Sequence, residues 1–282
     1  MHKNEDLRRM DQKSSQIFRR SALLPQVEMR RAHHSLACYH THTHDEFSVG
    51  VIDAGSAVCR QGSAFQTLHQ GTVVVINPGD AHSCNPRADQ AWSYRMLFID
   101  AHWLGGLQAD LPGSRSGDYR PLAVASSPAA RAYAQFDALF EALEREDDDA
   151  WGLEAQLMDF LMPLGQGDAA VGLAPSTPQR QLGRAREMIL DQLEDKITLD
   201  DVAQVAGLSR YHLIRSFKQA YGQTPHAFLL DQRINRAKQL LKQGNSMVDV
   251  AQQLGFADQS HFQRHFKKRH AVTPMHYQRS LA

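Results

Sequence analysis

The spacing of hydrophobic residues changes along the chain. Between residues 25 and 110, short apolar and β-branched runs such as 72–76 are separated by Gly, Pro and Asn. This pattern predicts short antiparallel strands in a barrel or jelly roll. Between residues 127 and 162, apolar residues recur at helical spacing in two stripes, which predicts a helical hairpin. The hairpin would either cover the barrel or pair with a second copy of the chain, and the pattern leaves both open.

Breaks in these patterns divide the chain into segments. Residues 1–24 are highly charged and without clear periodicity, so we expect a mobile arm or a weak helix. Residues 166–178 are small and rich in Gly and Pro, which is typical of a linker. The linker separates a β-rich domain at 25–165 from a helical domain at 179–282.

The helical domain contains the same pattern twice. Each copy has a short predicted helix, a glycine in the turn (Gly207 or Gly255), a longer basic helix and a Thr-Pro step. The offset is 48 residues up to the glycine and 49 after it, so the second turn carries one extra residue. A short helix, a glycine turn and a second helix predict a helix-turn-helix, here present twice. A predicted helix over 225–242 joins the two copies.

Charge separates the two halves. Residues 1–177 carry 15 Lys and Arg against 22 Asp and Glu, a net charge of −7, whereas residues 178–282 carry 16 against 9, a net charge of +7. A basic C-terminal half predicts a polyanionic partner for that half. No apolar run is long enough to span a membrane and the N-terminus has no signal core, so we expect a cytoplasmic protein. Three cysteines, Cys38, Cys59 and Cys84, form no spaced framework, which suits a reducing compartment.

The longer helix of each copy predicts a DNA-binding surface. Leu213 and Phe217, and likewise Phe262 and Phe266, share a face that should be buried. Polar and aromatic residues outside that face suit base edges and phosphates. We predict DNA contacts from Ser209, Arg210, Tyr211, His212, Ile214, Arg215 and Lys218 in the first copy, and from Gln259, Ser260, His261, Gln263, Arg264, Lys267 and Lys268 in the second. Arg269 is expected to join the two lysines at phosphates.

These motifs carry a family resemblance. Residues from about 180 to 280 resemble the DNA-binding domain of AraC/XylS-type transcriptional regulators, over the whole C-terminal third. The resemblance rests on motifs that include Gly207-Leu208-Ser209, Leu213-x-Arg215-x-Phe217-Lys218, Val250-Ala251-x-x-Leu254-Gly255-Phe256 and Ser260-x-Phe262-x-Arg264-x-Phe266-Lys267. It implies that Tyr211, Ile214 and Arg215, and Gln259, Ser260, Gln263 and Arg264, face the grooves. His270-Ala271 replaces the usual aromatic-Gly step.

A histidine cluster marks the N-terminal domain. On a strand, His40, His42, His44 and Glu46 would point to one face, and His82 and Cys84 follow a later turn. The spacing resembles the metal motifs of cupin barrels, and the domain resembles the cupin-like effector domain of AraC-type regulators. The effector-binding candidates are His42, His44, Glu46, His82 and Cys84. The candidate ligands for a divalent transition metal are His40, His42, Glu46 and His82. A ligand pocket without metal, a metal site, and neither of the two remain open.

The predicted fold is α+β and multidomain: an N-terminal cupin-like β-barrel with helices, then an all-α domain with two helix-turn-helix motifs. The predicted function is a ligand-responsive transcriptional regulator that binds promoter DNA and a small-molecule effector. The patterns over 42–47, 77–82 and 92–96 together resemble regulators found beside amino-acid exporters, which points to an amino-acid-like effector. We also expect a homodimer and contact with RNA polymerase. The alternative is a metal-dependent cupin enzyme fused to a DNA-binding module.

Overall fold

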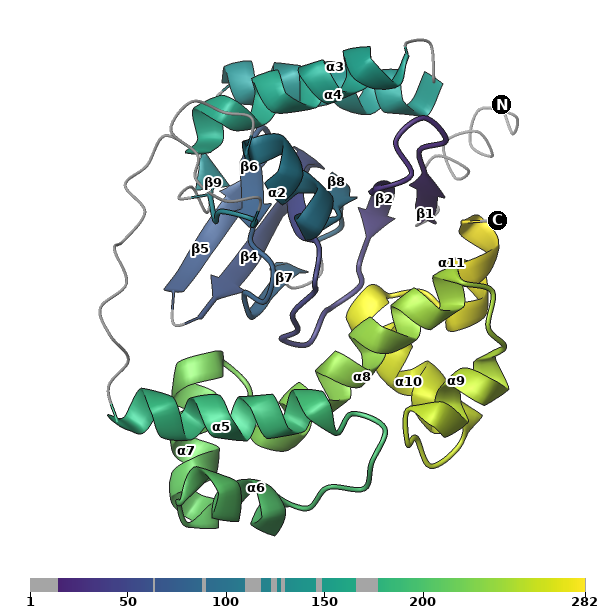
Figure 1. Ribbon diagram of the computed structural model, residues 1–282. Helices are drawn as coiled ribbons and strands as arrows, with labels where there is room; N and C mark the ends of the chain where they lie inside the picture. The colour runs from purple at the N-terminus through teal and green to yellow at the C-terminus, as the bar shows by residue number, and fades with distance from the viewer. Residues whose placement is uncertain are drawn as a thin grey trace.

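The computed structural model describes residues 15–62, 64–87, 90–109, 118–122, 126–127, 130–145, 149–165 and 177–281. Figure 1 shows a β-rich N-terminal domain beside a helical C-terminal domain. The predicted linker lies outside the described residues, apart from its last two, which begin the first helix of the C-terminal domain. Among the described residues, no helix is both long and apolar enough to cross a bilayer.

Two antiparallel sheets form the N-terminal domain. The larger has six strands in the order β1-β2-β8-β3-β6-β9, and the smaller has the order β5-β4-β7. The strands are β1 (Ser15–Arg20), β2 (Val27–Ser35), β3 (Phe47–Ala54), β4 (Ser56–Gln61), β5 (Ala64–His69), β6 (Val73–Ile76), β7 (His82–Pro86), β8 (Trp92–Ile99) and β9 (Ser126–Ser127). The N-terminal prediction is therefore confirmed as a β-sheet domain, but the two sheets do not close into a barrel.

Side chains of the larger sheet alternate between two apolar clusters. Val73 and Val75 of β6 face the helices α3 (Ala130–Arg145) and α4 (Ala150–Leu161), together with Phe136 and Phe140 of α3. Val74 and Ile76 belong instead to a cluster shared with the smaller sheet. Both faces of the sheet are thus covered, which explains the uninterrupted apolar run of β6. The hairpin of α3 and α4 lies on the side of the sheet away from the C-terminal domain (Figure 1).

Three local predictions are wrong. Residues 15–20 form strand β1 rather than an arm or a weak helix, because they pair with β2 along its edge. Residues 101–109 form helix α2 (Ala101–Ala109) after the last long strand. The segment 40–46 is not a strand; its contact with a sheet neighbour is one isolated bridge between His42 and His82. None of the three has a periodic pattern that the sequence alone would reveal.

The register of the smaller sheet also places two cysteines together. Cys59 of β4 lies directly opposite Cys84 of β7, and the two form a disulfide. This differs from the expectation that the cysteines form no framework. Their separation of 25 residues reveals nothing, since the pairing follows from strand register.

The C-terminal domain is all helical, as predicted. Its helices are α5 (Thr177–Asp191), α6 (Leu199–Ala206), α7 (Arg210–Tyr221), α8 (Pro225–Lys242), α9 (Met247–Gln253), α10 (Gln259–His270) and α11 (Pro274–Ser280). Local sequence fixes several ends: Thr198 caps α6 in a capping box, Ser209 caps α7, and Pro225 opens α8. Gly207 ends α6 with a left-handed backbone at φ 65°.

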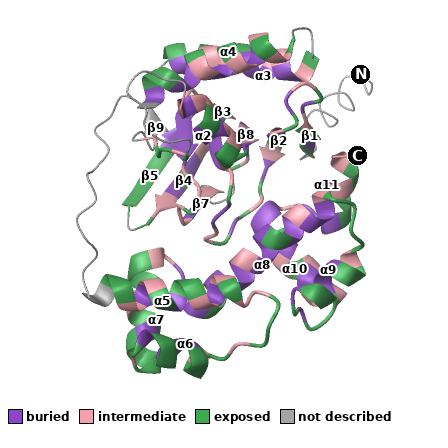
Figure 2. Ribbon diagram, viewed as in Figure 1, coloured by how far each residue is buried: buried purple, intermediate pink, exposed green. Residues whose placement is uncertain are grey.

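Helix α8 is shared by two cores. Its first part contributes Phe228 and Leu229 to the core of α5, α6 and α7. Its second part contributes Ile234 and Leu241 to the core of α9, α10 and α11. Figure 2 shows α8 mostly in the colour of buried residues. The second core also includes Phe18 from β1, so the N-terminal strand contributes to the folding of the DNA-binding domain.

Candidate functional site: a ligand cavity next to two helix-turn-helix units

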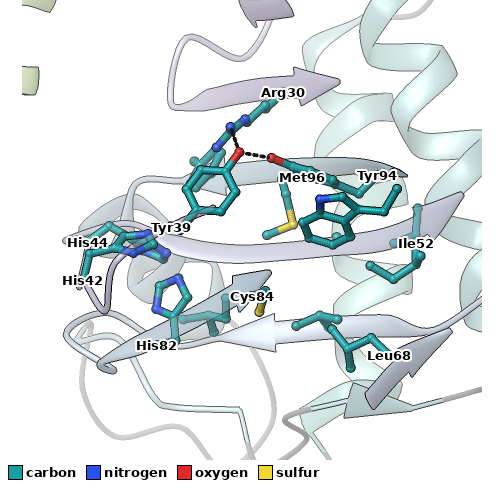
Figure 3. A pocket seen from close by; sticks show the side chains of 16 residues that line it. Arg30, Tyr39, His42, His44, Ile52, Leu68, His82, Cys84, Tyr94 and Met96 are labelled. Carbon is teal, nitrogen blue, oxygen red and sulfur yellow. Dashed lines mark hydrogen bonds between the residues drawn. The ribbon is translucent and has the colours of Figure 1, made fainter. Parts of the chain in front are cut away.

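A cavity lies between the two sheets. It encloses about 570 Å³ of empty space, including its opening. Figure 3 places His42, His44 and His82 at one end and Ile52 and Leu68 at the other. Cys84 also lines the cavity. Four of the five predicted effector-binding residues are therefore brought together, and Glu46 is the exception.

The three histidines have the same protonation pattern. Each ring places its Nδ1 next to a backbone carbonyl oxygen. The Nδ1 of His42 lies 2.8 Å from the carbonyl oxygen of His40, and the Nδ1 of His44 lies 2.8 Å from that of Glu46. The Nδ1 of His82 lies 2.9 Å from the carbonyl oxygen of Asp80. A carbonyl oxygen only accepts, so each Nδ1 must carry the proton and donate it. In a neutral ring Nε2 is then an acceptor. The rings of His42 and His82 are 4.4 Å apart, centroid to centroid.

The rings are neutral near pH 7. Burial, and after it a neighbouring histidine, lower the pKa of His42, His44 and His82 to about 3. A second charge in this cluster would be placed close to the first in a buried site, which disfavours it. The cluster therefore offers hydrogen-bond acceptors and not positive charge.

The predicted metal set does not fit the structure. The side chain of His40 is exposed. The Glu46 carboxylate leaves the cavity and accepts from Nζ of Lys238 at 2.9 Å and of Lys242 at 3.2 Å. Among the described residues, no group of three or more His, Cys, Asp or Glu is placed to hold a metal ion. The structure therefore does not bring the predicted ligands His40, His42, Glu46 and His82 together. The sequence of the N-terminal domain could not reveal this, because the two lysines that hold Glu46 lie on α8.

The cavity also contains polar residues that the sequence analysis missed. Nη2 of Arg30 donates to the hydroxyl of Tyr39 at 2.6 Å, and that hydroxyl shares a hydrogen bond with Tyr94 at 2.8 Å (Figure 3). The same Nη2 reaches the carbonyl oxygen of His270 in α10, at 3.2 Å. Trp92 lines the cavity as well. Arg30 lies in an ordinary strand pattern, so only the sheet register could identify it.

The segment 41–46 separates the cavity from the DNA-binding domain. His42 and His44 point into the cavity. On the other face, Thr43 donates to Asp231 of α8 from its backbone nitrogen at 2.7 Å and its hydroxyl at 2.8 Å. The carbonyl oxygen of Thr41 accepts from Gln223 at 2.9 Å. Alternate residues of one short segment thus contact the cavity and α8.

Further contacts join the two domains at the second helix-turn-helix unit. Tyr277 of α11 donates to the buried Glu28 carboxylate at 2.7 Å, and Lys242 Nζ lies 2.8 Å from the same carboxylate. Backbone nitrogen of His40 donates to the carbonyl oxygen of Lys268 in α10. The two lysines, chiefly Lys238, hold the pKa of Glu28 and Glu46 below the ordinary value against the opposing effect of burial.

The predicted DNA-binding face of α7 is available to solvent. Leu213 and Phe217 are fully buried, whereas Tyr211 is 67% exposed and Arg215 is exposed. His212, Ile214 and Lys218 are also exposed. Two predicted residues have structural contacts here: Ser209 caps the helix, and Arg210 forms an exposed ion pair with Asp200.

On α10 most of the predicted residues also reach the surface. Ser260, Arg264, Lys267 and Lys268 are exposed, and Gln259, His261 and Gln263 are half-buried. Arg269 is the exception. It is buried and its Nε donates to Asp231 at 2.9 Å, so the expectation that it contacts a phosphate is wrong. Its partner is 38 residues away on α8, beyond what the helix pattern of α10 reveals.

Comparisons with known proteins agree with this architecture. Residues 24–161 match the AraC-like ligand binding domain, and residues 202–280 match a helix-turn-helix domain. The chain belongs to the AraC family of transcriptional regulators. The family resemblance of the C-terminal motifs is thereby confirmed, as is the division into a ligand-binding and a DNA-binding domain.

Similar AraC-family proteins cover most of the chain. The uncharacterized regulator YbfI of Bacillus subtilis is 28% identical over 222 residues, which is 78% of this chain and 80% of that protein. The transcriptional activator RhaS of Escherichia coli is 26% identical over 239 residues, 83% of this chain and 85% of RhaS. The structure of ToxT from Vibrio cholerae has a TM-score of 0.54 at 14% identity, covering 91% of this chain and 98% of that one. The ToxT likeness concerns the fold alone.

Proposed function

We propose that this AraC-family regulator senses a ligand in the cavity between its sheets and passes the change to its DNA-binding domain through residues 41–46. One observation carries the proposal: His42 and His44 face the cavity, while Thr43 between them bonds to Asp231 of α8. A ligand shifts an equilibrium only through contacts that differ between states. Movement of the histidines on binding would change the contact with α8 directly.

Substitution of threonines in this segment tests the proposal. Thr43→Val removes the hydroxyl bond to Asp231 with little change in volume, whereas Thr41→Val leaves the carbonyl bond to Gln223 intact. With DNA selected in vitro for binding by the whole protein, we expect a Kd change of at least about threefold for Thr43→Val. We expect no change for Thr41→Val. Equal Kd values for wild type and Thr43→Val would show that the segment does not carry the signal.

We infer that the cavity serves binding and not catalysis. Among the described residues that line the cavity there is no Asp or Glu to pair with its histidines, and Glu46 is held by two lysines. The proteins it resembles are named as transcriptional regulators, which supports a non-enzymatic role. A related ToxT structure contains an unsaturated fatty acid, which supports a small-molecule ligand in this fold.

We also propose that the chain acts as a homodimer through α4. Trp151 is 82% exposed and Met162, just after the helix, is 45% exposed; Ala155 lies between them on the same face. These positions follow helical spacing on the hairpin, away from the DNA-binding domain (Figure 1). A two-fold dimer uses the same patch on both subunits, which suits one apolar stripe.

The homodimer is tested by the molar mass in solution. Trp151→Glu should convert a dimer to a monomer in light scattering, because it places a charge in the apolar contact. Phe65→Glu, at an exposed aromatic on β5, is the matched control and should remain dimeric. A dimer that survives Trp151→Glu would exclude this surface.

RhaS is named a transcriptional activator, which supports proposing contact with RNA polymerase at the promoter; transcription in vitro with purified polymerase tests it.

A further inference from the structure

The cavity contains hydrogen-bond acceptors without donors. Because Nδ1 of His42 and of His82 donates to a carbonyl oxygen, Nε2 of each presents a lone pair. No described residue donates to either Nε2. His44 differs, since the hydroxyl of Ser48 lies 3.2 Å from its Nε2 and donates to it. Two acceptors therefore remain at the histidine end of the cavity.

Two residues that line the same cavity have buried donors without acceptors. The indole Nε1 of Trp92 is buried and has no partner among the described residues. The Nε of Arg30, whose side chain also lines the cavity, is buried and equally unpaired. A buried donor without a partner is costly, so such atoms normally meet a protein group, water or a ligand.

We propose that the cavity binds an uncharged ligand whose polar groups both donate and accept hydrogen bonds, as hydroxyls and primary carboxamides do. The ligand would donate to Nε2 of His42 and His82 and accept from Nε1 of Trp92. Its apolar part would lie against Ile52 and Leu68, at the other end of the cavity (Figure 3). This inference rests on the proposed ligand-sensing function and defines the ligand class.

Charged head groups suit the site less well. At the histidine end a carboxylate would face the lone pairs of two imidazoles, and Arg30, whose side chain lines the cavity, already donates to Tyr39 and to the carbonyl oxygen of His270. Burial keeps both rings neutral at pH 7, so neither supplies a positive charge. An ammonium group would meet the positive charges of Arg30 and Arg269, which already lower the pKa of His42.

Four compounds with one phenyl body and different head groups test the assignment. They are 3-phenylpropanamide, 3-phenylpropane-1,2-diol, 3-phenylpropanoate and 3-phenylpropylamine. Calorimetric titration of the whole protein at pH 7.5 should detect binding of the amide or of the diol. The compound that binds shows whether the polar group of the ligand is a carboxamide or a hydroxyl. Tighter binding of the carboxylate or the amine would overturn the proposal, as would no binding by any of the four. No DNA is present, so a failure here leaves the DNA-binding tests unaffected.

Two variants connect binding to named atoms. Trp92→Phe keeps an aromatic ring but removes the N–H, and should weaken the amide or diol about five- to tenfold. Trp103→Phe removes an indole N–H from α2, outside the cavity, and is the matched control; it should leave the affinity unchanged. Equal affinities for wild type and Trp92→Phe would remove the indole from the site.

The tautomers can be measured without any ligand. Long-range ¹⁵N–¹H NMR spectra of histidine-labelled protein, assigned with His42→Gln and His82→Gln, should show neutral rings protonated at Nδ1. Protonation at Nε2, or an imidazolium at neutral pH, would overturn the proposal. So would a zinc ion retained at equal molar ratio after purification, because a metal would use the same lone pairs.

Discussion

The two helix-turn-helix units share a sequence pattern, yet they meet the ligand-binding domain differently. The first unit, α6 and α7, contacts it near Gly222 and Gln223, and a cleft lined by Tyr221 and Pro78 lies beside this contact. The second unit contains Phe18 of β1 in its core, and Tyr277 bonds to the buried Glu28. The two copies of the repeat therefore differ in their attachment. The second unit is fixed to the ligand-binding domain, whereas the first unit is joined to it more loosely.

This difference suggests how a ligand would act. Residues 40–46 and Arg30 connect the cavity to α10 through Lys268 and His270, to α8 through Asp231, and to the first unit through the bond from Gln223 to Thr41. Since most of these contacts are with α8 and the second unit, the proposed mechanism predicts that a change in the cavity reaches α10 and α8 first. The first unit would then change its position relative to the second. DNA that requires both recognition helices at a set spacing would respond to such a change.

The largest expected effect is at Asp231, which is fully buried between Arg269 and Thr43. Asp231→Ala would leave the Arg269 guanidinium buried without its counter-ion, so we expect a loss of about 3–5 kcal/mol in the free energy of unfolding. Urea unfolding measures it. Gln239→Ala, which removes a bond to the exposed Asp45, is the control and should cost little. A loss below about 1 kcal/mol for Asp231→Ala would contradict fixation of the second unit.

Acid should loosen the second unit before the first. Burial, followed by the charge of Lys238, holds the pKa of His270 well below 6.5, so the folded state keeps this ring neutral. An unfolded histidine binds a proton below pH 6.5, so stability is present above that value and is lost as pH falls, by up to about 1.4 kcal/mol per pH unit. The lowered pKa values of Glu28 and Glu46 add a further loss below about pH 4.5.

Hydrogen exchange at pH 7.0 and 5.5, corrected for intrinsic rates, measures this order. Peptides from α10 and α11 should lose protection on acidification, while peptides from α6 and α7 should keep theirs. His270→Phe removes the titrating ring and should reduce the loss. Earlier opening of α6 and α7 would reverse the comparison between the two units.

Both recognition helices should contribute to DNA binding. Arg215→Ala and Arg264→Ala are each expected to cost about 1–3 kcal/mol in specific binding, if their guanidinium groups contact base edges. Titrations with a selected DNA site, at fixed salt, measure the two values side by side. Unchanged affinity in both variants would show that these exposed arginines are not the readers.

The smallest expected effects concern the ends of the two recognition helices. Gly222 and Ala271 occupy equivalent positions and both have left-handed backbones, at φ 71° and 59°. Ala271→Gly should stabilise by roughly 0.5 kcal/mol, because glycine tolerates this conformation. A methyl group at residue 222 would lie 3.0 Å from Cβ of Ala81 in the ligand-binding domain, so Gly222→Ala should destabilise by about 1 kcal/mol. Thermal unfolding compares the two, and equal effects in one direction would contradict the different surroundings.

The sequence predicted most of the DNA-binding domain because its signals are local. Caps such as Thr198 and Ser209, the proline that opens α8 and the apolar stripes of α7 and α10 all act within a few residues. The exposed recognition residues follow from those stripes. Arg269 was misplaced since its partner, Asp231, lies on another helix.

The ligand cavity was only partly predictable. The spacing of His42 and His44 and the turn before His82 indicated a cluster, which the structure confirms. Glu46 does not join the cluster, because its carboxylate bonds to Lys238 and Lys242. These lysines are almost 200 residues away, so no local pattern indicates the contact. Arg30 and Trp92 reach the cavity because of the register of their strands in the sheet. The alternation of apolar and polar residues along a strand does not reveal this register, so the sequence could not identify them.

The position of Phe18 has a consequence for synthesis of the chain. On the ribosome the N-terminal domain emerges first, but the core that receives Phe18 also needs Phe266 and Tyr277. Until the final helix is made, strand β1 must carry an aromatic side chain that has no core to enter. The side chain of Phe18 is therefore buried only after the last helix is made, and a gene fragment that ends at the linker would yield a sensor with an exposed phenylalanine.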